Sequence, residues 1–193
     1  MTCEPRSGAV LRAYGLALAR PPRRAAPRTR CRRTGHGRCA AWRCRSEVLL
    51  SEAVEPPTVG PRRRLSGGRW WSYFDQAWVT SAGGLDIDHM VPLAESWDSG
   101  TSAWTEQGRE AYANDQGAAV SLMAVTARSN RAKADRDPAE WLLPAEAVHC
   151  RYLAEWVATK LRWGLSVDGT KAEALYETAT GCPAQSVTYE PTL

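Results

Sequence analysis

Three polar residue types that suit phosphodiester hydrolysis occur in order along the chain. Asp88 and His89 adjoin within "LDIDHMVPLAESW", and Asn114 and Asn130 follow. Hydrolysis of a phosphodiester requires a base with a pKa near neutral to activate water, a divalent metal to stabilise charge on the phosphate, and a group that orients the base. Histidine, aspartate and asparagine can meet these needs, so the four residues are candidates for one active site.

The residue types also predict individual roles. The neutral imidazole of His89 would be the general base. Asp88 and Asn130 would supply hard oxygen ligands, with waters and a substrate phosphate completing an octahedron, which favours Mg²⁺ over zinc and leaves Mn²⁺ open. Asn114 would fix the segment that carries His89 through hydrogen bonds. In a regular strand Asp88 and His89 point to opposite faces, so a shared site requires a twisted strand end.

Other polar residues lie close to these in the sequence, and their roles stay open. Asp86 is either an outer ligand of the metal or an ordinary solvent-facing strand residue. A basic group could grip phosphates beside the metal, although a solvated helix face explains it equally well. That group consists of Arg128, Arg131, Lys133 and Arg136.

Each of these residues alone is a weak signal. A single histidine near a strand end is more often structural or solvated than catalytic, and asparagine is common in turns. Their order along the chain, together with "NRAKAD" at the start of a helix, is what favours a nuclease site.

Local patterns place these residues on two strands and a helix. Residues 69–84 hold two aromatic and β-branched runs and predict a hairpin, whose tryptophans we assign to the core. Residues 85–91 predict a strand that ends before a proline, and 119–125 a second strand followed by a helix over 126–135. The segment between the two strands, 93–115, has helical character interrupted by a turn. The order is ββα with an insertion.

The C-terminal third predicts helices. Asp137 has the position of a helix cap, and residues 144–163 have apolar residues at three- and four-residue spacing with Gly164 as the stop. Thr170 begins a capping-box pattern for a last helix that Gly181 ends. The fold class is therefore α+β: a ββα core with an inserted helical segment, an N-terminal β-hairpin and C-terminal helices.

Two of the six cysteines fall in this predicted helical region. Cys150 lies inside one helix and Cys182 just after the next, which would let a disulfide pin the last helix to its neighbour. A bridge would imply an oxidising compartment. Two buried free thiols are the alternative.

Charge divides the chain. Residues 1–70 contain 16 arginines and four glutamates, whereas residues 71–193 contain nine basic and 17 acidic residues. The basic segment could bind nucleic acid or anionic membrane, but its lack of periodicity favours a solvated segment. We therefore predict that residues 1–45 are disordered or belong to an unreliable reading frame, and that residues 46–193 form one domain with its core motif at 85–141.

Membrane and export signals are weak. No apolar run approaches the ~20 residues of a membrane span, so no membrane association is expected. The apolar stretch at residues 8–19 ends in an A-x-A-like "ALA", but Arg12 interrupts it, so it makes no convincing signal peptide.

The order Asp-His, Asn, then Asn-Arg-x-Lys-x-Asp resembles the HNH, or ββα-metal, endonucleases. Residues 45–182 are most similar to the bacterial HNH family related to the C-terminal domain of GmrSD restriction endonucleases, many members of which are small secreted proteins. The same order occurs in the HNH domain of RNA-guided CRISPR nucleases. The resemblance implies His89 as base, Asp88 and Asn130 as metal ligands and Asn114 at the middle position of the motif.

The resemblance also implies a substrate and a location. Lys133 and Asp135 match family positions, which makes them supporting residues of the site. The implied activity is hydrolysis of DNA, with RNA also open, by a secreted enzyme. No recognition module for base readout accompanies the motif, so little sequence preference is expected.

Two other function classes stay open. One is a nucleic-acid-binding protein that does not cut, which would use the basic segment and the basic helix residues. The other is a disulfide-stabilised structural domain in which the polar residues only satisfy one another. In each case we expect a monomer.

Overall fold

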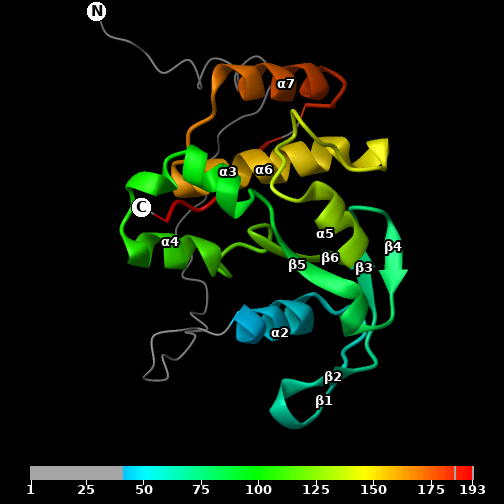
Figure 1. The fold of residues 1–193 in the computed structure, drawn as a ribbon. Helices are drawn as coiled ribbons and strands as arrows, with labels where there is room; N and C mark the ends of the chain where they lie inside the picture. The colour runs from blue at the N-terminus through cyan, green and yellow to red at the C-terminus, as the bar shows by residue number, and fades with distance from the viewer. Residues whose placement is uncertain (1–40, 185, 193) are drawn as a thin grey trace, which may run out of the picture.

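The structure, a computed structural model, describes residues 41–184 and 186–192, with side chains from residue 45 onward (Figure 1). The predictions of a basic tail and of a leader fall largely on residues 1–40, which lie outside the described residues. The domain boundary at residue 46 therefore stays a prediction.

The described chain starts with a helix and two short hairpins. Helix α2 (Ala41–Glu52) is followed by β1 (Thr58–Val59) and β2 (Leu65–Ser66), which pair with each other, and then by β3 (Trp70–Ser72) and β4 (Ala77–Val79), which also pair. The second hairpin confirms the one predicted over residues 69–84. Its tryptophans only partly follow the prediction: Trp70 is buried, but Trp71 and Trp78 are substantially exposed. In this three-residue strand the side chains alternate, so Trp71 cannot share the inner face with Trp70.

A third antiparallel pair carries the candidate site. Strand β5 (Leu85–His89) pairs with β6 (Leu122–Thr126), in a register that sets Asp88 opposite Met123 and His89 opposite Leu122. Helix α5 (Ala127–Lys133) begins directly after β6, where the side chain of Thr126 accepts a hydrogen bond from the Ser129 backbone N–H. Because α5 starts without a loop, it packs against both strands.

The segment between β5 and β6 is helical, as predicted. Helix α3 (Leu93–Asp98) starts after Pro92, which stops β5 because proline cannot donate to a strand ladder. A short 3-10 turn (Thr101–Ala103) leads to α4 (Glu106–Ala113), which Thr105 caps by accepting from the Gly108 N–H. Mixed helices and small antiparallel sheets confirm the predicted α+β class.

Two apolar clusters hold these elements together. The larger contains Phe74, Val125, Tyr152 and Trp156, and joins the strands to the C-terminal helices. The smaller includes Leu49 and packs α2 against the other side of the β5–β6 pair (Figure 1). Burial of large apolar side chains on both sides fixes the strands that carry the site.

The C-terminal helices are α6 (His149–Trp163) and α7 (Gly169–Thr180). Gly164 ends α6 in the left-handed conformation at φ 62°, as predicted. The predicted helix start at Asp137 is wrong: its carboxylate caps a single turn by accepting from the Ala139 N–H at 2.8 Å. Pro144 explains the difference, since the residue before a proline is disfavoured in the helical region.

The cap of the last helix also differs from the prediction. Asp168, two residues before Thr170, accepts a hydrogen bond from the Lys171 backbone N–H at 2.9 Å and begins α7. Both aspartate and threonine are good N-caps, with aspartate ranked higher. Gly181 ends the helix as predicted.

Cys150 and Cys182 form a disulfide with a Cα–Cα distance of 5.5 Å. The bridge joins the first turn of α6 to the second residue after the end of α7, close to where it was predicted, and the alternative of two free thiols is wrong. Within the described part of the chain, no helix has the length and apolar content needed to cross a membrane.

Candidate active site

A cleft of about 300 Å³ opens at the end of β5, between that strand, the start of α3 and the end of α5. Three of the four residues predicted to do chemistry, Asp88, His89 and Asn130, line it. Asn114 is not among the lining residues. The full lining is Ile87, Asp88, His89, Pro92, Leu93, Asn130, Arg131, Ala134 and Asp135.

Asp88 forms a buried ion pair in the floor of this cleft. Its Oδ2 accepts from the Lys133 amine at 2.6 Å, and both side chains are almost completely buried. The same amine donates to the backbone carbonyls of His89 at 2.6 Å and Met90 at 3.1 Å. An ammonium has three donors, and here each has an acceptor, so the geometry fits a charged lysine.

Burial acts on both members of the pair. It raises the pKa of the Asp88 carboxyl, while the charge and hydrogen bond of Lys133 oppose that shift. It lowers the pKa of the Lys133 amine, while Asp88 opposes that shift in turn. Each charge is therefore stabilised in the protein interior mainly by the other.

The burial of Lys133 corrects one prediction. A fully buried amine that is bonded to three protein oxygens cannot grip a substrate phosphate from a solvated helix face. The sequence held a signal for this position, because Lys133 follows Asn130 by three residues and so shares its face of α5.

His89 is held by the backbone of the inserted segment. Its Nε2 lies 3.0 Å from the Ala113 carbonyl oxygen, and its ring stacks beside that of Tyr112. A carbonyl can only accept, so Nε2 carries the proton and the neutral ring keeps Nδ1 as its unprotonated nitrogen. Burial lowers the pKa of His89, which favours this neutral form. The side chain is thus suited to accept a proton at Nδ1.

Asn130 reaches the cleft from the second turn of α5. Its Nδ2 lies 3.4 Å from Asp86 Oδ2, and the guanidinium of Arg131 lies 3.6 Å from the same oxygen. Because the carboxylate attracts the amide nitrogen, the amide oxygen of Asn130 is left as the acceptor. Asp86, half-buried on β5, therefore orients the side chain that was predicted to bind metal.

Asn114 stands at the C-terminus of α4. Its side-chain Nδ2 donates to the Glu110 carbonyl at 2.8 Å and closes the last turn of the helix. The His89 ring instead donates its hydrogen bond to the carbonyl of the preceding residue, Ala113. The predicted restraint on His89 is thus present in the backbone next to Asn114, and a direct role for Asn114 stays a prediction.

The predicted phosphate-binding arginines are all exposed, but they differ in position. Arg131 lines the cleft, with a side chain 77% exposed. Arg136 folds back and donates to the carbonyls of Ala132 and Lys133 at the end of α5. Arg128 lies in the first turn of that helix, and Asp135 lines the cleft as an exposed acid. Arg131 is therefore best placed to meet a substrate.

The donor set of the cleft limits which metal could bind. Among the described residues, no group of three or more histidine, cysteine, aspartate or glutamate side chains is arranged to hold an ion. A zinc site of the usual protein type needs three or four such ligands. One carboxylate and one amide oxygen, from Asp88 and Asn130, fit Mg²⁺ instead, because that ion keeps several of its waters.

Comparison with known proteins identifies the family. Residues 59–178 match the family described as GmrSD restriction endonucleases, C-terminal domain. The chain belongs to this family. The matched range contains every residue that lines the cleft, and membership confirms the resemblance seen in the sequence and points to a nuclease-related function.

A relative from Arthroderma benhamiae bears the name "Uncharacterized secreted protein". It is 38% identical over 138 residues, which span 72% of this chain and 67% of the relative. No solved structure matches the chain.

Proposed function

We propose that this protein is a metal-dependent endonuclease that hydrolyses phosphodiester bonds in DNA, with RNA as a second substrate, and with little sequence preference. The observation that carries the proposal is the convergence of Asp88, His89 and Asn130 on one cleft. Family membership supports the nuclease class. The β5–β6 pair with α5 then corresponds to the ββα-metal core expected from the sequence.

His89 is the general base of the proposed reaction. Its Nδ1 accepts a proton from the attacking water, while the bond from Nε2–H to the Ala113 carbonyl holds the ring in place. The depressed pKa keeps the ring neutral near pH 7, as a base must be. Asn114 acts as a positioning residue in this scheme, because it closes the helix end that presents the Ala113 carbonyl.

Asp88 and Asn130 would hold the metal, Mg²⁺ or Mn²⁺. A bound divalent ion supplies charge stabilisation on the phosphate and the leaving oxygen. Lys133 donates to Asp88 Oδ2, so Oδ1 of Asp88 would be the atom that binds the metal. Asp86 keeps the amide oxygen of Asn130 available by attracting its nitrogen.

Substrate contacts come from the exposed arginines. Arg131 lies at the cleft and would meet the phosphate next to the one that is cut, with Arg128 and Arg136 farther along α5. Such contacts give affinity that does not depend on sequence. Asp135 is exposed at the rim of the cleft. Its negative charge would limit how closely the nucleic acid strand approaches Arg131.

The protein is proposed to act as a monomer outside the cell. Its disulfide requires an oxidising compartment to persist, and the Arthroderma relative is named a secreted protein.

Incubation of supercoiled plasmid with the purified protein tests the proposal. We expect nicked and linear products with Mg²⁺ or Mn²⁺ and none after chelation by EDTA. Retardation of the plasmid in a gel without cutting at any metal concentration would favour the non-cleaving binding protein. Absence of both binding and cutting would favour the structural domain.

A further inference from the structure

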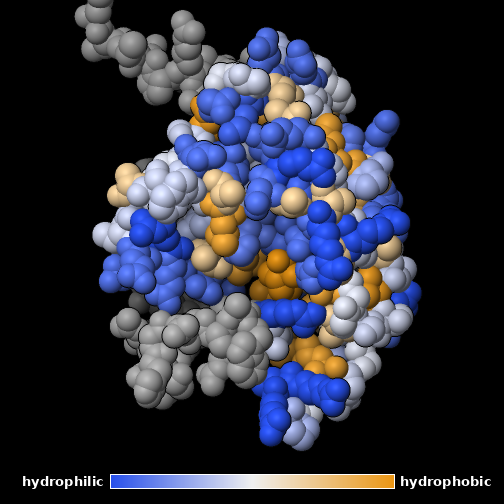
Figure 2. Space-filling model, in the orientation of Figure 1, coloured by the Kyte–Doolittle hydropathy of each residue, from blue (hydrophilic) through white to orange (hydrophobic). Residues whose placement is uncertain are grey.

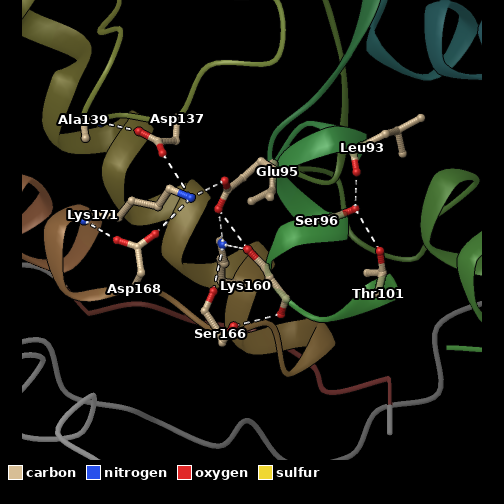
Figure 3. A network of polar contacts seen from close by, with 12 residues as sticks. Leu93, Glu95, Ser96, Thr101, Asp137, Ala139, Lys160, Ser166, Asp168 and Lys171 are labelled. Carbon is tan, nitrogen blue, oxygen red and sulfur yellow. Dashed lines mark hydrogen bonds and ion pairs between the residues drawn. The ribbon is translucent and has the colours of Figure 1, made fainter. Parts of the chain in front are cut away.

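Helix α3 has one face locked to the rest of the protein. On that face the buried carboxylate of Glu95 accepts from Lys160 Nζ at 2.5 Å and from Lys171 Nζ at 2.7 Å. Lys171 also pairs with Asp137 and Asp168, so the network ties α3 to α6, α7 and the turn after α5 (Figure 3). Buried charges with several partners fix geometry firmly, because loss of any one leaves another unpaired.

The opposite side of α3 is exposed and carries two large apolar side chains, next to the exposed acid Asp98. Leu93 is 47% exposed and Trp97 is 50% exposed. The two are four residues apart in one helix, so they lie on the same side, one turn apart. Leu93 also lines the cleft. The apolar surface therefore starts at the wall of the proposed active site and extends one helical turn, about 5.4 Å, away from it.

A positive charge completes this surface. The guanidinium of Arg109, from α4, lies over the Trp97 ring at 5.4 Å from its centroid, and it is tethered by a bond to the Trp104 carbonyl. A guanidinium can cover only one face of an indole, and half of Trp97 is exposed to solvent. Figure 2 shows several separate hydrophobic patches on this side of the molecule, with hydrophilic surface between them.

We propose that Leu93, Trp97 and Arg109 form a platform on which an unpaired nucleobase stacks while its strand passes through the cleft. The proposal rests on the nuclease function above and specifies its substrate. A planar apolar group joined to an anion fits this surface, because the indole offers a stacking face and the guanidinium offers charge to the phosphate. The rigid anchoring of α3 places this face at a fixed distance from Asp88 and His89.

The platform predicts a preference between substrates. In a duplex both faces of a base are already covered by its neighbours, so it must leave the stack before it can contact Trp97. A base in a single strand, a loop or a frayed end has a free face. The enzyme is therefore selective for nucleic acid with unpaired nucleotides. Its phosphate contacts do not depend on the base sequence.

The test measures binding of a fluorescein-labelled single-stranded 12-mer to the full chain by anisotropy, in EDTA so that no strand is cut. Trp97→Ala should weaken binding about tenfold, within the range of aromatic stacking on one base. Trp97→Phe, which keeps an aromatic face, should recover most of the affinity. With Mg²⁺ restored, Trp97→Ala should lower kcat/KM for the single strand by a similar factor and leave that for the duplex unchanged.

Trp78→Ala is the matched control. Trp78 is 47% exposed and also has an arginine, Arg69, over its ring at 3.9 Å, but it lies on β4, away from α3 (Figure 1). This variant should bind the single strand within twofold of wild type. Equal binding by Trp97→Ala and wild type overturns the platform, as does equal weakening by the two alanine variants.

Three other outcomes show whether the platform fails alone or together with the nuclease proposal. If wild type cuts both substrates and Trp97→Ala leaves their ratio unchanged, the platform fails and the nuclease function stands. If sedimentation shows that Trp97→Ala abolishes a dimer while binding is unchanged, the face is a contact between two copies and the platform also fails. If wild type neither binds nor cuts any strand, both proposals fail.

Discussion

The amine of Lys133 lies 2.6 Å from Asp88 Oδ2, and both side chains are buried beneath the candidate active site. This pair links the last turn of α5 to the end of β5. The residue proposed to bind metal therefore has its charge stabilised from inside the protein, and the proposed activity would depend on the same contact as stability.

Lys133→Met should cost stability, because it leaves a buried carboxylate without its partner. We expect a loss of about 3–5 kcal/mol in the free energy of unfolding, measured by urea denaturation. Glu47→Ala, which breaks the partly exposed pair with Arg63, is the control and should cost less than about 1 kcal/mol. The double variant Asp88→Asn, Lys133→Met should regain part of the loss, and a single variant as stable as wild type would contradict the assigned ion pair.

Glu52 should make stability depend on pH. Its carboxyl accepts a hydrogen bond from the Ala124 backbone N–H at 2.9 Å, and burial raises its pKa from 4.5 to about 7. Between those values the folded state binds more protons than the unfolded state, so this group's contribution to stability falls as pH rises from about 4.5 to about 7.

The variant Glu52→Gln keeps an acceptor for Ala124 and removes the titration. The free energy of unfolding of the variant, relative to that of wild type, should therefore increase as pH rises through that window. The increase from pH 4.5 to above pH 7 should be roughly 2–3 kcal/mol. Melting curves of both proteins from pH 4.5 to 8 measure the difference. A constant difference at all pH values would show that the pKa of Glu52 is not raised.

Removal of the disulfide should lower stability without abolishing the site. The bridge closes a loop across 32 positions, for which chain entropy predicts a loss of about 3–4 kcal/mol in the Cys150→Ala, Cys182→Ala variant. Neither cysteine lines the cleft, so the variant should still cut plasmid below its melting temperature. An unchanged melting temperature would contradict a structural role for the bridge.

Asn130→Ala should weaken the binding of the metal. It removes one of two proposed oxygen ligands, so the Mg²⁺ concentration for half-maximal cleavage should rise at least tenfold. Arg128→Ala, on the same helix but outside the cleft, should leave that concentration unchanged. The same Mg²⁺ requirement in Asn130→Ala and wild type would remove this residue from the proposed ligand set.

The sequence predicted the elements that position the site better than the contacts within it. Leu85 and Ile87 alternate with acids and Pro92 ends the run, so the strand carrying Asp88 and His89 was readable from local pattern. The cap at Asp137 was also predicted from local pattern. The sequence pattern did not predict that only a single turn follows this cap before Pro144. Local preferences act over a few residues, and the strand and the cap are both features of that length.

Contacts between distant segments could not be read in this way. The Ala113 carbonyl that holds His89 is a backbone group, and no residue type marks it. The burial of Lys133 depends on how α5 packs on β5, and the exposure of Trp71 and Trp78 depends on nothing covering that face of a short hairpin within the described chain. Each of these three features is decided by tertiary packing, which periodicity and capping patterns do not predict.

The most direct test of the central claim compares two histidines in a plasmid cleavage assay with Mg²⁺. His89→Ala should lose activity by about 10²–10⁴-fold, the usual contribution of a general base. His149 is its matched control, because its Nε2 also bonds a backbone carbonyl, that of Leu143 at 2.7 Å, yet it lies outside the cleft. His149→Ala should cut like wild type, whereas equal cutting by His89→Ala and wild type would show that His89 is not the general base.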